Sequence, residues 1–200
     1  SEWGFPRAYL NDFRLMHMFL TDFAPVLAPM TSTLADYAPD VANTEKLRHA
    51  VRSRSGSGFL FINNYVRHLP MAEHKNVQFT LELPGERLTI PAQGGLDIAD
   101  GVYTAIAFNL KLGQAHLKYS TAHPFCILNN DRITYCFYAV EGIAPEYQFT
   151  AESLRDLTVR GGEVIETDGI VTVGAMQPGR DCIIRLHDVS GREIEIVTLR

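Results

Sequence analysis

The feature of this sequence that most constrains its fold is the strict alternation of apolar and polar side chains between Val77 and Leu83. A period of two places successive side chains on opposite faces of a β-strand, so one face of this segment contacts a core and the other faces water. Similar short segments, separated by turn signals such as Pro84-Gly85, Asp100-Gly101 and Ser190-Gly191, continue to the end of the chain. Short strands at this spacing predict an antiparallel sandwich or barrel.

The expected strands cover most of the chain after residue 46. They are residues 47–51, 59–66, 77–83, 87–90, 103–110, 115–120, 124–128, 133–140, 162–166, 169–173, 182–187 and 193–199. We therefore expect a mainly β protein, with one N-terminal helix followed by antiparallel β-sandwich-type domains. The grouping of the strands suggests two small β modules, one over 46–150 and a second over 151–200.

The first 45 residues differ from the rest. Apolar residues recur there at the spacing of one helix face, and Pro6 suits a first helical turn. The residues of this face are Tyr9, Phe13, Met16, Leu20, Phe23 and Leu27. Leu15 and Met18 fall on the opposite side, so the helix is expected to need partners on more than one flank. Pro25 ends the helix near Phe23, and residues 24–44, with three prolines, read as an extended connector.

Composition and charge narrow the classes of partner. The formal net charge is -5, and no run of Lys or Arg is present that would neutralise consecutive phosphates, so nucleic acid is not expected as a partner. The apolar stretch over residues 15–20 is far shorter than the roughly 20 residues that cross a bilayer. No membrane span is expected.

Sequence motifs for catalysis or cofactor binding are missing. The run Ser55-Gly56-Ser57-Gly58 lacks the strand-to-helix context of a nucleophile elbow and reads as a turn. No glycine motif for a nucleotide is found, and the seven histidines show none of the spacings of metal ligands. We therefore expect no cofactor, no metal site and no catalytic residue.

A carbohydrate site is usually built from carboxylates, which hydrolyse the sugar, and from aromatic rings, which stack on it. Glu82 alternates with leucines and is expected to face solvent, whereas Glu86 lies at a Pro-Gly turn where an ordinary glutamate pKa is expected. Most tyrosines alternate with apolar neighbours inside strands and are expected to pack in or beside the core. Trp3, outside any strand, is the single candidate for contact with a sugar.

The three cysteines, Cys126, Cys136 and Cys182, have no metal-ligand spacing. If residues 129–132 turn a hairpin, Cys126 and Cys136 lie opposite one another and can form a cross-strand disulfide in an oxidising compartment. The alternative is a pair of buried free thiols, which is the state we expect.

Several segments together resemble the β-domain that follows the catalytic barrel in glycoside hydrolase family 35, the β-galactosidases. The resemblance is carried by residues 47–53 (LRHAVRS), 58–65 (GFLFINNY), 77–81 (VQFTL), 88–91 (LTIP), 108–110 (FNL), 117–122 (LKYSTA) and 146–149 (EYQF). The opening Ser1-Glu2-Trp3-Gly4 resembles the stretch after the last barrel strand, and residues 9–23 resemble the closing helix of the barrel.

This resemblance implies that the chain is a non-catalytic part of a larger enzyme. In that family two glutamates on barrel strands perform retaining hydrolysis of terminal β-galactosyl residues, and neither has a counterpart here. The implied partner is the catalytic barrel of the same parent chain, with a galactoside as a possible ligand, and the implied location is extracytoplasmic. The alternative function is a carbohydrate-binding module of a secreted glycoside hydrolase.

Overall fold

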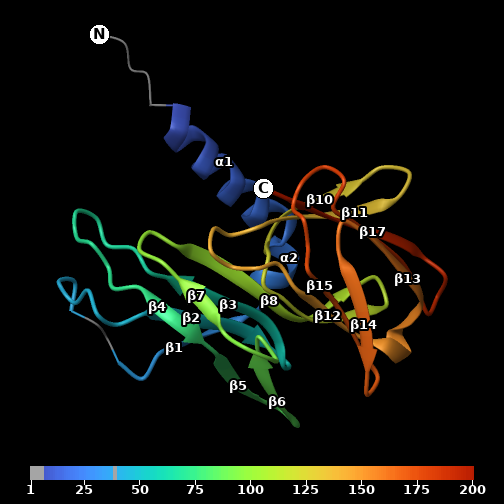
Figure 1. Cartoon of the computed structure of the whole chain (residues 1–200), viewed down its shortest axis with the longest axis horizontal. Coiled ribbons are helices and arrows are strands. Elements are labelled where there is room, and N and C mark those ends of the chain that lie inside the picture. The colour runs from blue at the N-terminus through green and yellow to red at the C-terminus, as the bar shows by residue number, and fades with distance from the viewer. Residues whose placement is uncertain (1–6, 38–39) are drawn as a thin grey trace.

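The computed structural model describes residues 7–37 and 40–200 and confirms a mainly β protein with one main helix (Figure 1). The helices are α1 (Arg7–Asp22), α2 (Ala24–Leu27) and the single 3-10 turn η1 (Ala151–Ser153). The strands are β1 (Thr31–Leu34), β2 (Arg48–Arg54), β3 (Ser57–Asn63), β4 (His74–Val77), β5 (Phe79–Leu83), β6 (Glu86–Ile90), β7 (Leu96–Ile98), β8 (Tyr103–Leu112), β9 (Ala115–Ser120), β10 (His123–Asn129), β11 (Ile133–Tyr138), β12 (Tyr147–Thr150), β13 (Leu154–Arg160), β14 (Glu163–Thr167), β15 (Ile170–Gly174), β16 (Ile183–Asp188) and β17 (Glu193–Leu199).

Two large sheets form a sandwich. The first has eight strands in the order β1-β2-β3-β8-β9-β12-β15-β14, and the second has five in the order β10-β11-β17-β16-β13. The pairs β4-β7 and β5-β6 form two further small sheets. Neighbouring strands of the large sheets run antiparallel except for β11 and β17, which pair in parallel. The long alternating segment expected over 77–83 is divided, because β4 ends at Val77 and β5 begins at Phe79.

The eight-stranded sheet is buried on both faces at its centre. In β8, Ala105 and Ala107 face the five-stranded sheet and join the main core, whereas Ile106 and Phe108 belong to a second core on the other face. The β5-β6 hairpin and β7 cover that second core with residues such as Leu81. Burial on both faces explains why β8 reads as a nearly continuous apolar run rather than as an alternating strand.

The expected boundary at residue 150 does not divide the sandwich. Residues 151–200 contribute β13, β16 and β17 to the five-stranded sheet that β10 and β11 begin. They also contribute β14 and β15 to the eight-stranded sheet, where β15 pairs with β12. The expectation that 151–200 forms a sheet system of its own was wrong. All of its strands belong to the two large sheets, which also contain strands from earlier residues.

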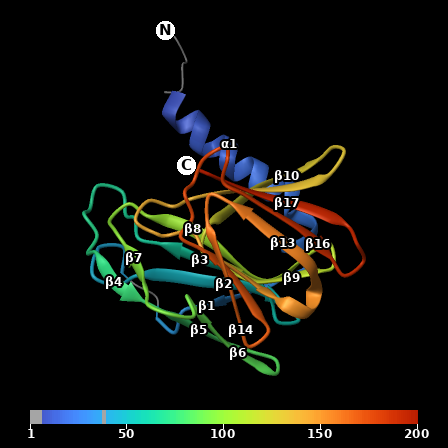
Figure 2. The ribbon, with the colours of Figure 1, turned by 45° about the vertical axis from the view of Figure 1, so that its right-hand side comes forward.

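Helix α1 ends at Asp22, as the proline at position 25 indicated, and α2 follows with Pro25 in its first turn. The expected extended connector over 24–44 therefore contains a short helix and also the edge strand β1. Figures 1 and 2 both show one end of α1 beside β10 and the other end standing clear of the sheets. No helix among the described residues is long and apolar enough to cross a membrane.

Candidate functional site

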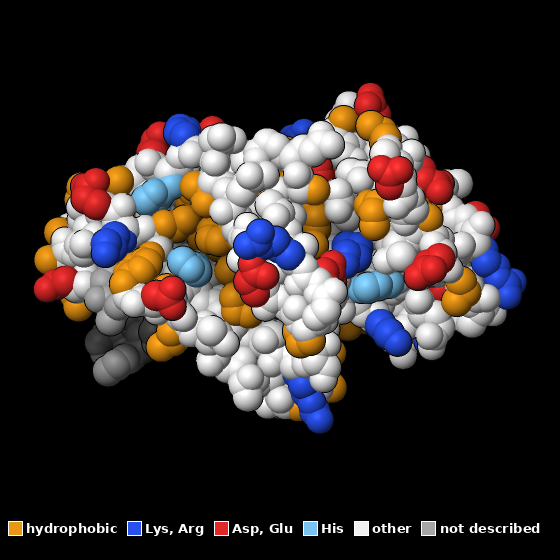
Figure 3. All heavy atoms as spheres, turned by 90° about the horizontal axis from the view of Figure 1, so that it is seen from below, with side chains coloured by type: hydrophobic (Ala, Val, Ile, Leu, Met, Phe, Trp, Pro, Cys, Tyr) orange, Lys and Arg blue, Asp and Glu red, His pale blue; other side chains and the backbone are white. Residues whose placement is uncertain are grey.

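Trp3, the residue predicted to contact a sugar, lies outside the described residues. Among residues 7–37 and 40–200, no group of three or more His, Cys, Asp or Glu side chains is arranged to hold a metal ion. The face of the molecule seen in Figure 3 carries Lys and Arg side chains interspersed with Asp and Glu, and hydrophobic side chains line the hollows between them. Two regions have features of a functional site: an exposed apolar helix face and a pocket with a polar network on one wall.

The first region is an apolar stripe on α1, which we call the exposed α1 face: Phe13, Met16 and Leu20. These side chains are 52%, 46% and 49% exposed. Spacings of three and four residues place them on one side of the helix. They are three members of the face that the sequence predicts, whereas its last two members, Phe23 and Leu27, lie beyond α1 and are buried in the main core.

The flank of α1 next to this stripe is buried through Phe19, and Phe23, directly after the helix, is buried beside it. Phe19 and Phe23 are 3% and 2% exposed and enter the main core, where each ring packs edge-on against Phe59 with centroids 5.5 and 5.9 Å apart. The carboxylate of Asp22 accepts a hydrogen bond of 2.7 Å from the backbone N–H of Ile127 in β10. These contacts fix the C-terminal half of α1, and the fixed half determines where the exposed α1 face points.

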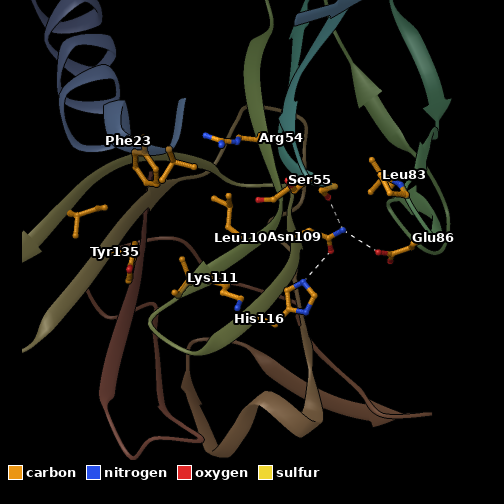
Figure 4. Close-up of a pocket in the computed structure, with 16 residues that line it drawn as sticks. Phe23, Arg54, Ser55, Leu83, Glu86, Asn109, Leu110, Lys111, His116 and Tyr135 are labelled. Atoms are coloured by element: carbon orange, nitrogen blue, oxygen red, sulfur yellow. Dashed lines mark hydrogen bonds between the residues drawn. The ribbon is translucent and has the colours of Figure 1, made fainter. Parts of the chain in front are cut away.

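The second region, which we call the hairpin pocket, has a volume of about 540 Å³. It lies between α2, the β2-β3 turn, the β5-β6 hairpin and the β8-β9 hairpin (Figure 4). Its lining residues are Phe23, Val26, Arg54, Ser55, Gly56, Ser57, Leu83, Pro84, Glu86, Asn109, Leu110, Lys111, Leu112, His116, Ile127 and Tyr135. A mostly apolar lining with a few convergent polar groups is typical of a small-molecule site.

Asn109 is the centre of a polar network on one wall of this pocket. Its side-chain amide donates to the carbonyl of Gly56 and to Glu86 Oε2, both at 3.0 Å, and its Oδ1 lies 3.2 Å from His116 Nε2 (Figure 4). The backbone of Asn109 has a φ of 49°, a left-handed conformation that Asn tolerates better than most residues. This kink within β8 turns the amide toward the hairpin.

Two further contacts complete the network. Lys118 forms a part-buried ion pair with Glu86, and Thr150 Oγ1 lies 3.0 Å from His116 Nδ1. Because Oδ1 of Asn109 can only accept, His116 carries its proton on Nε2 and accepts from Thr150 through Nδ1. The network therefore joins the β2-β3 turn, the β5-β6 hairpin and strands β8, β9 and β12.

The network shifts the protonation of its members. Partial burial raises the pKa of the Glu86 carboxyl, but hydrogen bonds from Lys118 and Asn109 outweigh burial, so the pKa lies below its ordinary value. The expectation that Glu86 titrates like free glutamate was wrong, because the turn folds onto the large sheet. Burial, reinforced by the Lys118 ammonium, lowers the pKa of His116. At neutral pH the pocket wall thus holds a neutral imidazole and a paired carboxylate.

This arrangement fits a structural role better than glycoside hydrolysis. Sugar hydrolysis by the general mechanism needs two carboxylates on either side of the substrate. Glu86 is the only carboxylate among the described residues that line the hairpin pocket, and Lys118 neutralises it. Glu82 is exposed, as expected, and pairs with Arg87 at 2.7 Å. What the network does is hold the β5-β6 hairpin against the eight-stranded sheet.

The tyrosines were expected to lie in or beside the core, and several do. Tyr119 and Tyr147 are fully buried. Tyr65 and Tyr103 are instead 51% and 54% exposed. Both lie at one end of the large sheet, because Tyr103 pairs with Asn63, and the side chain of Asn63 accepts a hydrogen bond of 3.1 Å from the backbone N–H of Tyr65.

Sequence patterns alone do not reveal the network around Asn109. The only local signal is a polar residue inside the apolar run of β8, in Phe-Asn-Leu over residues 108–110. Glu86 and Gly56, its partners, lie 23 and 53 residues away, so only the tertiary fold brings them together. No protein-family model matches this chain, and no curated protein matches its sequence.

Proposed function

We propose that this chain is a non-catalytic structural and interaction domain of a family 35 β-galactosidase, which packs against the catalytic barrel of the same parent protein. The observation that carries the proposal is the exposed α1 face. Phe13, Met16 and Leu20 are each about half exposed, although their helix is anchored one turn further on in a well-packed core.

An isolated helix end is unstable in water unless its apolar face is covered. A helix segment of this length is marginal in water without tertiary contacts, so its stability comes from packing of an apolar face. A stripe with i, i+3 and i+7 spacing fits between the ridges of another helix. The outer layer of an α/β barrel is a ring of helices, which gives such a stripe its partner.

The proposed membership of family 35 is supported by the sequence segments that resemble its β-domain. It places hydrolysis of terminal β-galactosyl residues in the parent barrel and assigns no chemistry to this domain. It also assigns the parent enzyme to an extracytoplasmic compartment. The polar network of the hairpin pocket fits this assignment, because its carboxylate is already neutralised by Lys118.

The first test is the intact mass of the native protein that carries this sequence. The proposal predicts a mass larger than the 22.4 kDa of these 200 residues by a whole barrel, on the order of 250 residues or more. A native mass near 22.4 kDa would contradict it.

The second test perturbs the surface within the parent protein. A Phe13→Ser/Leu20→Ser variant should lower the melting temperature and speed thermal loss of nitrophenyl-galactoside hydrolysis, because the barrel loses its apolar contact. The matched control is Leu34→Ser, since Leu34 is 74% exposed on the edge strand β1 and away from the helix. Equal effects of both variants would show that the α1 stripe is not an interface.

A second candidate function is favoured by one observation. Tyr65 and Tyr103 are both more than half exposed at the same end of the large sheet, and aromatic rings are the usual platform for the apolar face of a sugar. A carbohydrate-binding module predicts that galactose or a galactoside changes the tyrosine fluorescence with saturation. Tyr65→Ala should abolish that change, whereas no saturable signal at millimolar sugar would exclude this function.

A further inference from the structure

Cys126 and Cys136 lie directly opposite one another in the β10-β11 hairpin. They are Cα partners in the antiparallel ladder, and both are buried, at 3% and 6% exposure. Their neighbour Phe137 points into the main core, so alternation directs Cys136 to the other face of the five-stranded sheet. There the two thiols form a small cluster with Phe125, and Met18 of α1 packs against it.

This geometry meets the requirements of a disulfide. Residues directly opposite in an antiparallel pair have Cα atoms about 4.5 or 5.5 Å apart, depending on their hydrogen bonding. A disulfide spans Cα separations of about 4.4–6.8 Å. We infer that Cys126 and Cys136 are an oxidation site and form a cross-strand disulfide when the chain folds in an oxidising compartment.

The third cysteine is not a competitor. Cys182 is buried just before β16, and its Sγ donates a hydrogen bond of 3.5 Å to the carbonyl of Gly161. It lies outside the cluster that holds the other two thiols. All three cysteines are buried free thiols in the structure, as expected from the sequence, and they comprise one matched pair and one isolated thiol.

The burial of Cys126 and Cys136 determines at which stage of folding the disulfide forms. The thiolate is the attacking species in disulfide exchange, and burial raises the pKa of Cys126 to about 12 and that of Cys136 above its ordinary value. Met18 and the Asp22–Ile127 hydrogen bond also hold α1 over this part of the hairpin. Oxidation is thus slow in the finished fold and fast while the hairpin exists without α1 docked on it.

The chemistry balances with glutathione disulfide as the oxidant. One cysteine thiolate attacks glutathione disulfide, forming a mixed disulfide and releasing one glutathione thiolate. The second cysteine then attacks the protein sulfur of that mixed disulfide, which forms the Cys126–Cys136 bond and releases a second glutathione. The two protein thiols lose two protons and two electrons, and the oxidant gains both.

The test is refolding of the 200-residue chain from urea in a buffer of reduced and oxidised glutathione. After blocking free thiols and digestion without reductant, one peptide pair linking Cys126 to Cys136 is expected, with Cys182 as the single alkylated cysteine. The intact mass should fall by two hydrogens. The oxidised protein should also melt on the order of 5 °C higher than the reduced protein.

Matched variants separate the pair from the isolated thiol. Cys182→Ser should still form the bond, whereas Cys136→Ser should leave Cys126 as a free thiol or a glutathione adduct. Adding the same oxidant to the folded chain should give a much slower reaction that accelerates with rising pH. Three alkylated cysteines after refolding, or a bond that includes Cys182, would overturn the inference, and the wild-type peptide map decides it even if a variant fails to fold. This outcome is independent of the mass test for the proposed function.

Discussion

Two sides of the helical segment over residues 13–23 contain the same kinds of residue but have opposite surroundings. On the buried side, Phe19 and Phe23 are almost fully buried against Phe59, whereas on the exposed side Phe13, Met16 and Leu20 are about half exposed. Helix propensity and hydrophobicity do not explain this difference, because both sides are rich in apolar side chains. The difference lies in what each side contacts: the exposed side needs a surface that the described residues do not provide, and the buried side has the main core and β10 beside it.

The largest expected effect comes from truncating a side chain on the buried side. Phe23→Ala should lower the free energy of unfolding by about 4 kcal/mol, because it removes a ring from the main core and leaves a cavity. Phe13→Ala is the matched control and should change the free energy by less than about 0.5 kcal/mol. Urea unfolding followed by circular dichroism measures both. A similar decrease in the free energy of unfolding for the two variants would mean that the buried and exposed sides do not differ in their contribution to stability.

The next effect is a pH dependence from a histidine of β10 that packs against the buried side. His123 packs against the Phe19 ring, and its Nδ1 accepts a hydrogen bond of 2.9 Å from the backbone N–H of Ala105. Burial lowers the pKa of His123 to about 4, whereas an unfolded histidine titrates near 6.5. The unfolded state therefore binds more protons between these values, so stability is complete above pH 6.5 and falls as the pH drops toward 4.

The loss over that window should reach about 3 kcal/mol, with a smaller contribution in the same direction from His116, whose pKa is also lowered. Unfolding free energies at several pH values measure it. His123→Asn keeps a side-chain acceptor without the titration and should flatten the curve. An unchanged slope in this variant would assign the pH dependence to other groups.

A smaller effect is expected where α1 is tied to the sheet. Asp22→Ala removes the acceptor of the Ile127 N–H and should cost about 1.5 kcal/mol, because a part-buried donor then lacks its partner. Asp22→Asn is the control, since its amide oxygen still accepts, and it should cost less. If both variants unfold at the same urea concentration as the wild type, the hydrogen bond does not anchor the helix.

The smallest effect is expected for an exposed residue of α1 in the 200-residue chain. Comparing it with the effect in the parent protein distinguishes a free surface from an interface. In the 200-residue chain, Met16→Ser should change the free energy of unfolding by less than about 0.5 kcal/mol, because its side chain already contacts water. In the parent protein the same substitution should cost about 1–2 kcal/mol if the barrel covers this side chain. Thermal unfolding of both proteins gives the comparison, and equal small effects would contradict an interface.

Sequence patterns predicted most of the strands because their signal is local. β9 and β17 begin and end at the expected residues, and turn signals such as Asn129–Asp131 do separate β10 from β11. β13 was not predicted because Arg155 and Asp156 interrupt its apolar spacing, and β12 because it has only four residues. Both strands form because a neighbour supplies their hydrogen bonds, which a single segment does not reveal.

The pattern of α1 shows a different limit. The sequence indicates that the helix is apolar on more than one side, and the structure agrees, since Met18 packs against β10 while Phe13 stays exposed. Which side contacts the sandwich was not predictable, because Phe19 and Asp22 gain their partners Phe59 and Ile127 from segments far along the chain. The pocket network around Asn109 was unpredictable for the same reason.

Strand β17 lies inside the five-stranded sheet, between β11 and β16, although strands β12 to β16 separate it from β11 in the sequence. A nascent chain can form the β10-β11 hairpin on the ribosome, but the other edge of β11 then has no partner until β17 has been synthesised. An unpaired edge strand is a template for pairing with other chains. Between the synthesis of β11 and the emergence of β17 from the ribosome, this edge is therefore exposed to other chains. A molecular chaperone that covers it in this period has its largest effect.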